Sequence, residues 1–420
     1  MYLESIIEHI ERLPDSDLKE IDTYSNLCNL TRENLISILD AMTDVRAVEM
    51  IQPKLKNDLE AEKLLKEMRR EELIKDNETL QKFLDKIPLL SFSVIKIAFM
   101  ASAGFMFAAL ITPWLISILH KYKLWRKSVR QEAMGGGGLP IFTKFHQEGE
   151  VKTPRFGGVL IWVTPPFLAL LFFFLAKTQN PWFEGLNFLS RSQTWLPLAT
   201  LVVASAVGFL DDMLQVVATP GNAFVRSLWE RINKYTAGGL SLHLRITLVS
   251  FIGVTGAWWF FYKLDWSVLH VPGIGDYEIG WWYVPIFILV LVATAFSVNE
   301  SDGLDGLAGG IMLFSYGAYT ALAFALGRVE LAMFCAAIAG GLLAFLWFNV
   351  YPARFFMGDT GAMSLGMTLG VIAMLTNSAL VLPIIAFPLV LESTSVIIQV
   401  TSKKLRGKKV FMSAPIHHHF

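Results

Sequence analysis

The feature that most constrains this chain is a series of long apolar runs that begins near Leu89 and continues almost to the C-terminus. Each run is about 18 residues or longer, which is the length an α-helix needs to cross ~30 Å of hydrocarbon. Hydrophobic residues make up 54% of the chain, too many for an ordinary soluble protein. The sequence therefore predicts an all-α, polytopic membrane protein with about nine crossings, at 92–119, 157–176, 195–217, 245–264, 281–298, 307–326, 330–350, 361–376 and 379–400.

The first 88 residues differ from the rest in charge and in pattern. They carry 13 Lys and Arg against 20 Asp and Glu, whereas residues 89–420 carry 23 against 16. Stretches such as LTRENLISILDAM place Leu, Ile and Met at helical spacing among charges, which is typical of solvated helices. The sequence thus predicts a charged helical extension of unknown function over 1–88 and a polytopic transmembrane domain over 89–420.

Basic residues are unequally shared between the connections. Those after the odd-numbered crossings hold 18 Lys and Arg, and the others hold 4. Because Lys and Arg are retained on the cytoplasmic side, the connections after odd-numbered crossings are expected to face the cytoplasm.

Five polar clusters fall on that same side. In chain order they are KTPRFGG, GFLDDMLQ with Asp211 and Asp212, SVNESDGLDGLAGG with Asn299, Asp302 and Asp305, FNVYPARFFMGDTGA with Asn349 and Asp359, and APIHHHF. Each has an ordinary explanation as well: a solvated membrane boundary, a tight glycine-rich entry into a helix, or, for Asp359, a helix N-cap. Glu392, inside the last crossing, is expected only to pair with a neighbouring helix.

The convergence of these clusters indicates more than any one of them. Five carboxylates with few basic neighbours would repel one another unless a hard cation lies among them, and Mg²⁺ prefers such oxygen ligands together with phosphate. The residues therefore favour a metal-assisted phosphoryl transfer to or from a lipid. A transporter would use the same residue types but would place them near the bilayer midplane.

These motifs, with SVIIQVTSKKLRGKKVFMSAPIHHHF at the end of the chain, resemble the phospho-N-acetylmuramoyl-pentapeptide transferase family of the polyprenyl-phosphate N-acetylhexosamine-1-phosphate transferases (glycosyltransferase family 4). The resemblance implies Mg²⁺-dependent transfer of phospho-MurNAc-pentapeptide from UDP-MurNAc-pentapeptide to undecaprenyl phosphate. The products would be lipid I and UMP, in the first membrane step of peptidoglycan synthesis. It also implies a multi-pass protein of the bacterial cytoplasmic membrane whose site faces the cytoplasm. A homodimer stays open, and nothing indicates a nucleic-acid partner.

The resemblance further implies roles for single residues. Asp359 would ligate the metal, and Asp211 would deprotonate or orient the lipid phosphate. Phe356 would stack on the uracil, and Lys234 would bind a phosphate. The full set comprises catalytic Asp211, Asp212, Asp302, Asp305, His417 and His418, and substrate-binding Thr153, Lys234, Asn299, Asn349, Phe356, Gln399 and His419.

Several departures from the family pattern leave alternatives open. Gln215 stands where the family usually has lysine, Phe296 where asparagine is common, and the tenth helix expected after the histidines is missing, so Phe420 is expected to be a truncation point. One alternative is transfer of another UDP-N-acetylhexosamine 1-phosphate to a polyprenyl phosphate. Others are an inactive membrane scaffold and a lipid transporter.

Overall fold

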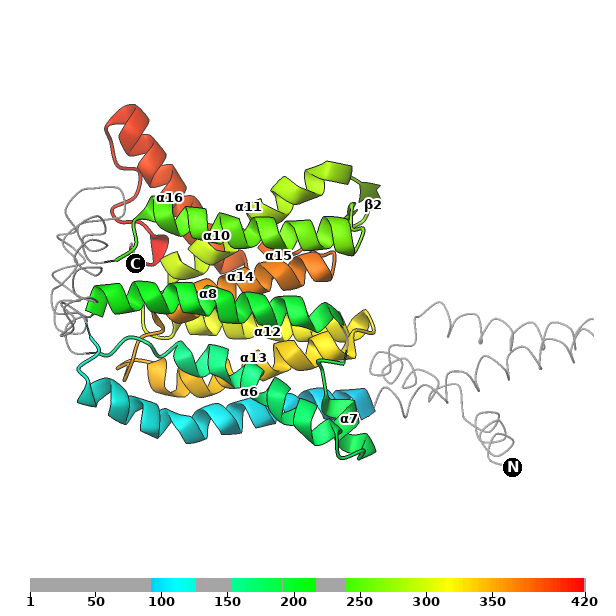
Figure 1. Cartoon of the computed structure of the whole chain (residues 1–420). Helices are drawn as coiled ribbons and strands as arrows, with labels where there is room; N and C mark the ends of the chain where they lie inside the picture. The colour runs from blue at the N-terminus through cyan, green and yellow to red at the C-terminus, as the bar shows by residue number, and fades with distance from the viewer. Residues whose placement is uncertain (1–91, 126–152, 191, 217–238, 419–420) are drawn as a thin grey trace, which may run out of the picture. The chain divides into compact units, whose positions relative to one another are not determined.

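The computed structural model describes residues 92–125, 153–190, 192–216 and 239–418. The chain divides after Leu89 into two units, and the predicted extension 1–88 lies outside the described residues. What is described of the second unit is a bundle of helices with one short hairpin (Figure 1). This confirms the all-α, polytopic prediction.

Eight of the described helices are long and apolar enough to cross a membrane. They correspond to the first eight predicted crossings. Their bounds are Phe92–Lys121, α6 Val159–Ala176, α8 Ser192–Val216, α10 Leu242–Trp258 with a π-helical turn Trp259–Lys263, α11 Tyr283–Ser301 after a 3₁₀ turn Gly280–Trp282, α12 Leu307–Ala325, α13 Val329–Asn349 and α14 Gly358–Leu375.

The ninth predicted crossing, 379–400, is not one continuous helix in the structure. It is split into α15 (Leu382–Ile385) and α16 (Phe387–Arg406), and each piece has proline at its first turn, where the missing N–H costs least. The last turn of α16 carries Lys403, Lys404 and Arg406. These charges lie beyond residue 400, and α16 is not one of the eight described helices above.

Two short elements on the connections were not predicted. Helix α7 (Pro181–Leu186) begins where the Asn180 side chain accepts a hydrogen bond from the backbone N–H of Trp182 at 3.0 Å. Strands β1 (Val268–Val271) and β2 (Gly275–Glu278) form an antiparallel hairpin. Elements of four to six residues are too short for a hydrophobic pattern that would predict them from the sequence.

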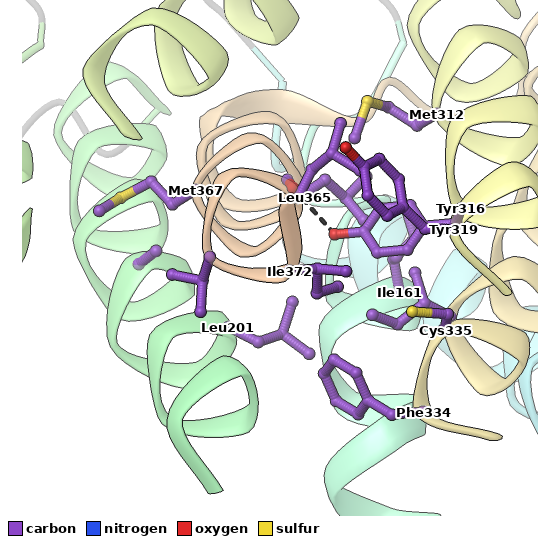
Figure 2. Packing of buried hydrophobic residues seen from close by; sticks show 14 of the residues in the cluster. Ile161, Leu201, Met312, Tyr316, Tyr319, Phe334, Cys335, Leu365, Met367 and Ile372 are labelled. Atoms are coloured by element: carbon purple, nitrogen blue, oxygen red, sulfur yellow. Dashed lines mark hydrogen bonds between the residues drawn. The ribbon is translucent and has the colours of Figure 1, made fainter. Parts of the chain in front are cut away.

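Helix α14 is the centre of the bundle, and all of its residues are buried. Figure 2 shows its Leu365 and Ile372 between Leu201 of α8 and Tyr316 of α12. The Tyr316 hydroxyl donates to the backbone oxygen of Leu365 at 2.9 Å, which satisfies the polar end of a buried ring. A helix packed on all sides in this way holds its N-terminus in a defined position.

Candidate active site

The N-terminus of α14 is capped by the carboxylates of Asp212, in α8, and of Asp302, directly after α11. The backbone N–H groups of Asp359 and Thr360 donate to the two carboxylate oxygens of Asp212, at 3.1 and 2.9 Å. The N–H of Gly358 donates to Asp302 Oδ2 at 3.2 Å. The first N–H groups of a helix have no partner within it and lie at the positive end of its dipole. Because Asp212 and Asp302 supply these caps, the Asp359 side chain is available for other contacts.

Two glycines allow this close approach. A Cβ at Gly208 of α8 would overlap the backbone oxygen of Asp359. Gly358 has φ of +73°, and a Cβ there would meet the Asp212 carboxylate. The left-handed region at Gly358 is open to glycine with little strain. The glycines of GFLDD and MGD therefore bring α8 against the start of α14.

Asp211 and Asp359 form a second, separate pair of buried carboxylates. Asp211 is fully buried and Asp359 is 5% exposed. The guanidinium of Arg245, from α10, pairs with Asp211 and lies 3.3 Å from Asp359 Oδ2. One turn after Asp211, Gln215 Nε2 donates to Asp211 Oδ2 at 3.2 Å and to Asp359 Oδ2 at 2.8 Å. The amide of Asn299 donates to the other oxygen of Asp359. Like charges so close together are tolerated only with such compensation.

The charges of the site do not balance among the described residues. Its four carboxylates are Asp211, Asp212, Asp302 and Asp359, and two guanidinium groups are paired with them. Arg155 Nε lies 3.4 Å from Asp212 Oδ1, and Arg245 pairs with Asp211 and Asp359. Burial raises the pKa of Asp302 to about 7, although Arg155 acts in the opposite direction. An excess of buried carboxylate is an environment that stabilises a divalent cation.

The donor set fits Mg²⁺ by its chemistry. Asp211 and Asp359 present hard carboxylate oxygens from adjacent helices. Both accept from the Gln215 amide and pair with the Arg245 guanidinium, and a bound cation would take the place of these donors. In the part of the chain that the structure describes, no group of three or more His, Cys, Asp or Glu is arranged to hold a metal. An ion here would thus take one or two carboxylates and complete its shell with water and phosphate oxygens, which is the usual arrangement for Mg²⁺.

Asp305 and Asn349 brace the loops beside the site. Asp305 Oδ2 accepts from the N–H of Ala353 at 3.0 Å. The Asn349 side chain accepts from the N–H of Gly306 at 3.0 Å and donates to the oxygen of Phe355 at 2.9 Å. Both residues lie in the predicted clusters, and in the structure their side chains bind backbone atoms.

The segment that contains Thr153 lies against the residues that precede α14. The N–H of Phe356 donates to the oxygen of Pro154 at 2.8 Å, and the N–H of Gly157 donates back to Phe356 at 2.9 Å. The ring of Phe356 is partly exposed, whereas Phe355 is fully buried. This pairing carries Arg155 into the site. Arg155 was not among the predicted site residues, although it lies in the KTPRFGG cluster.

The C-terminal tail is held by α16. Gln399 accepts from the N–H groups of Val410 and Phe411 at 3.0 and 2.9 Å, and donates to the oxygen of Phe411 at 2.8 Å. His417 Nδ1 lies 2.9 Å from Glu392 Oε2. Of the remaining predicted residues, Lys234, His419 and the side chain of His418 lie outside the described residues.

Comparisons with known proteins identify the family. A model of glycosyl transferase family 4 matches residues 194–377, which include both carboxylate pairs. The phospho-N-acetylmuramoyl-pentapeptide-transferase of Geobacillus thermodenitrificans is 33% identical over 322 residues, 76% of this chain and 87% of that protein. The enzyme of the same name in Clostridium perfringens is 32% identical over 77% of this chain and 88% of its own length. The one in Heliobacterium modesticaldum is 36% identical over 74% of this chain and 84% of its own length. This multi-pass membrane protein is therefore an enzyme, a transferase that belongs to the phospho-N-acetylmuramoyl-pentapeptide-transferase family.

Proposed function

We propose that this enzyme transfers phospho-MurNAc-pentapeptide from UDP-MurNAc-pentapeptide to undecaprenyl phosphate, giving lipid I and UMP. The observation that carries the proposal is the buried Asp211 and Asp359 pair, which shares the Arg245 guanidinium. Two phosphorylated substrates bring several negative charges to one place, so the protein must chiefly position them and offset that charge. The names of the relatives support phospho-MurNAc-pentapeptide as the transferred group.

In the proposed reaction, an oxygen of the lipid phosphate forms a bond to the sugar-linked phosphorus of the donor. The bond from that phosphorus to the oxygen of UMP breaks, and UMP leaves. Asp211 orients the lipid phosphate and accepts any proton it still carries, since its second pKa is about 6. Arg245 donates to phosphate oxygens, because a guanidinium matches their geometry. Mg²⁺, held by Asp359, would supply charge neutralisation that makes UMP a better leaving group.

The remaining predicted residues are proposed to bind the donor around this centre. Phe356, whose ring is partly exposed beside the start of α14, would stack on the uracil. Asp302, Asp305, Asn299 and Asn349 would shape the polar cleft. Lys234 and Thr153 would contact phosphate, and Gln399 and His417 to His419 would border the sugar-nucleotide.

The site is proposed to face the cytoplasm of a bacterium from its cytoplasmic membrane. The end of α8, the end of α11 and the start of α14 meet through hydrogen bonds to one helix terminus, which supports a site on one side of the bundle. The distribution of Lys and Arg favours the cytoplasmic side. A charged helical extension over 1–88 stays a prediction.

The experiment is release of UMP by purified protein given undecaprenyl phosphate and Mg²⁺. One reaction contains UDP-MurNAc-pentapeptide, and a parallel one contains UDP-GlcNAc. We expect release only with the first donor. Release with UDP-GlcNAc alone would move the assignment to another N-acetylhexosamine transferase, and release with neither would contradict transferase activity toward both donors.

A further inference from the structure

We propose that Glu392 is a positioning residue that fixes the ring of His417 for the reaction. The proposal rests on the proposed function, in which His417 borders the sugar-nucleotide. Glu392 Oε2 lies 2.9 Å from His417 Nδ1 and 3.4 Å from its backbone nitrogen. The two side chains are 8% and 5% exposed, so this contact is shielded from water. Shielding makes the interaction stronger than a surface pair.

The contact specifies which atom of the ring can exchange a proton. A carboxylate oxygen accepts a hydrogen bond, so we assign the N–H of this contact to Nδ1 of His417. In that tautomer Nε2 carries the lone pair and is the ring atom that can exchange a proton. By holding a histidine in one tautomer and one orientation, a carboxylate partner positions it to act as an acid or a base.

Glu392 acts on His417 and not on the tail as a whole. Other residues of α16 hold the preceding stretch, since Gln399 binds the backbone of Val410 and Phe411. Ser402 Oγ donates to the oxygen of Lys408 at 2.9 Å. Loss of the Glu392 carboxylate should therefore free the ring of His417 and leave residues 408–411 in place.

The same part of α16 is joined to the carboxylate site through α11. Ser393, next to Glu392, donates to Glu300 Oε2 at 2.7 Å and lies 2.8 Å from Ser297 Oγ. The residue before Glu300 is Asn299, whose amide donates to Asp359. The end of α11 thus contacts both the predicted metal ligand and the helix that holds His417.

The test is a double-mutant cycle on UMP release with UDP-MurNAc-pentapeptide. We expect Glu392→Ala to lower kcat about 10- to 100-fold, part of the ~10²–10⁴ that a positioned acid–base group contributes, with KM changed less than about threefold. Glu392→Gln, which keeps an oxygen acceptor, should lose less. In a His417→Ala background, Glu392→Ala should add less than about twofold, because its effect passes through the ring. Ser402→Ala is the control and should change kcat by less than about twofold.

Trypsin cleavage after Lys408 and Lys409 separates positioning from tail docking. We expect the same cleavage rate in Glu392→Ala as in the unsubstituted protein. Faster cleavage, or an equal loss of kcat with and without His417, would assign Glu392 a merely structural role and overturn the proposal. An active enzyme that tolerates His417→Ala would overturn this proposal alone. No UMP release from the unsubstituted protein would overturn the proposed function, and this inference with it.

Discussion

Asp211 and Asp212 are neighbours in sequence with different surroundings. On an α-helix, successive side chains point about 100° apart. Asp212 therefore faces the N-terminus of α14 and accepts two of its N–H groups. Asp211 faces Arg245 and Gln215 instead. The Asp212 carboxylate caps a helix, and the Asp211 carboxylate is the one that we propose takes part in the reaction.

Asp211→Asn should remove activity and spare the fold. The amide keeps the size of the side chain and a hydrogen-bond acceptor but loses the charge that orients and deprotonates the lipid phosphate. We expect UMP release to fall about 100-fold or more, with an unchanged melting temperature in detergent. Activity within a few-fold of the unsubstituted enzyme would exclude Asp211 from the reaction.

Asp212→Ala, in contrast, should first lower the stability of the protein. It leaves the buried N–H groups of Asp359 and Thr360 without their acceptor, which costs about 1–3 kcal/mol for each such group. We expect a melting temperature several degrees lower, measured in detergent without substrate. Asp212→Asn, which retains one acceptor oxygen, should lose less, and equal melting of all three proteins would contradict the capping role.

At the scale of elements, small residues determine how α8 meets α14. A Cβ at Gly208 would overlap the backbone of Asp359, and one at Gly366 would overlap Thr294 of α11. Membrane helices often approach through small residues because lipid offers no hydrophobic driving force between them. The distance between the carboxylates of α8 and α14 therefore depends on the absence of a side chain at Gly208.

Gly208→Ala should separate the two helices. We expect a loss of about 1–3 kcal/mol in stability from overpacking, and lower UMP release, because Asp211 moves away from Asp359. The matched control is Gly317→Ala in α12, where an added Cβ meets nothing within 4 Å. That variant should match or slightly exceed the original stability, since alanine favours a helix. Similar melting and activity of the two variants would contradict a tight α8–α14 contact.

At the scale of the whole molecule, a bound cation should link the helices that supply its ligands. Mg²⁺ that binds only the folded protein raises stability by about 2.7 kcal/mol at a hundred times its Kd. We expect Mg²⁺ to raise the melting temperature by several degrees and EDTA to abolish UMP release. Asp359→Asn should remove both the Mg²⁺-dependent shift and the activity, while it melts normally without metal. A full Mg²⁺ shift in that variant would exclude Asp359 as a ligand.

The sequence predicted the first eight crossings because hydropathy over about 20 residues is a local property. The break inside the ninth, between α15 and α16, was missed, because an average over about 20 residues does not register the prolines in the first turns of the two helices. The four carboxylates that the structure brings together were singled out from the sequence, since ionisable groups at membrane depth are unusual, and their roles stay predictions. Arg155 was missed as a member of the site because a single arginine at a membrane boundary carries no such signal.

The sequence by itself determined that this chain is a bundle of membrane helices with acidic motifs on one side, and which family it resembles. Only the tertiary structure decided what each polar residue contacts. Asp212 accepts hydrogen bonds from residues 147 and 148 positions away, and Glu392 contacts a histidine 25 positions away. No local pattern contains such partners, because they depend on how closely packed helices fit side by side. The division of the carboxylates into those that cap α14 and those that share Arg245 therefore follows from packing.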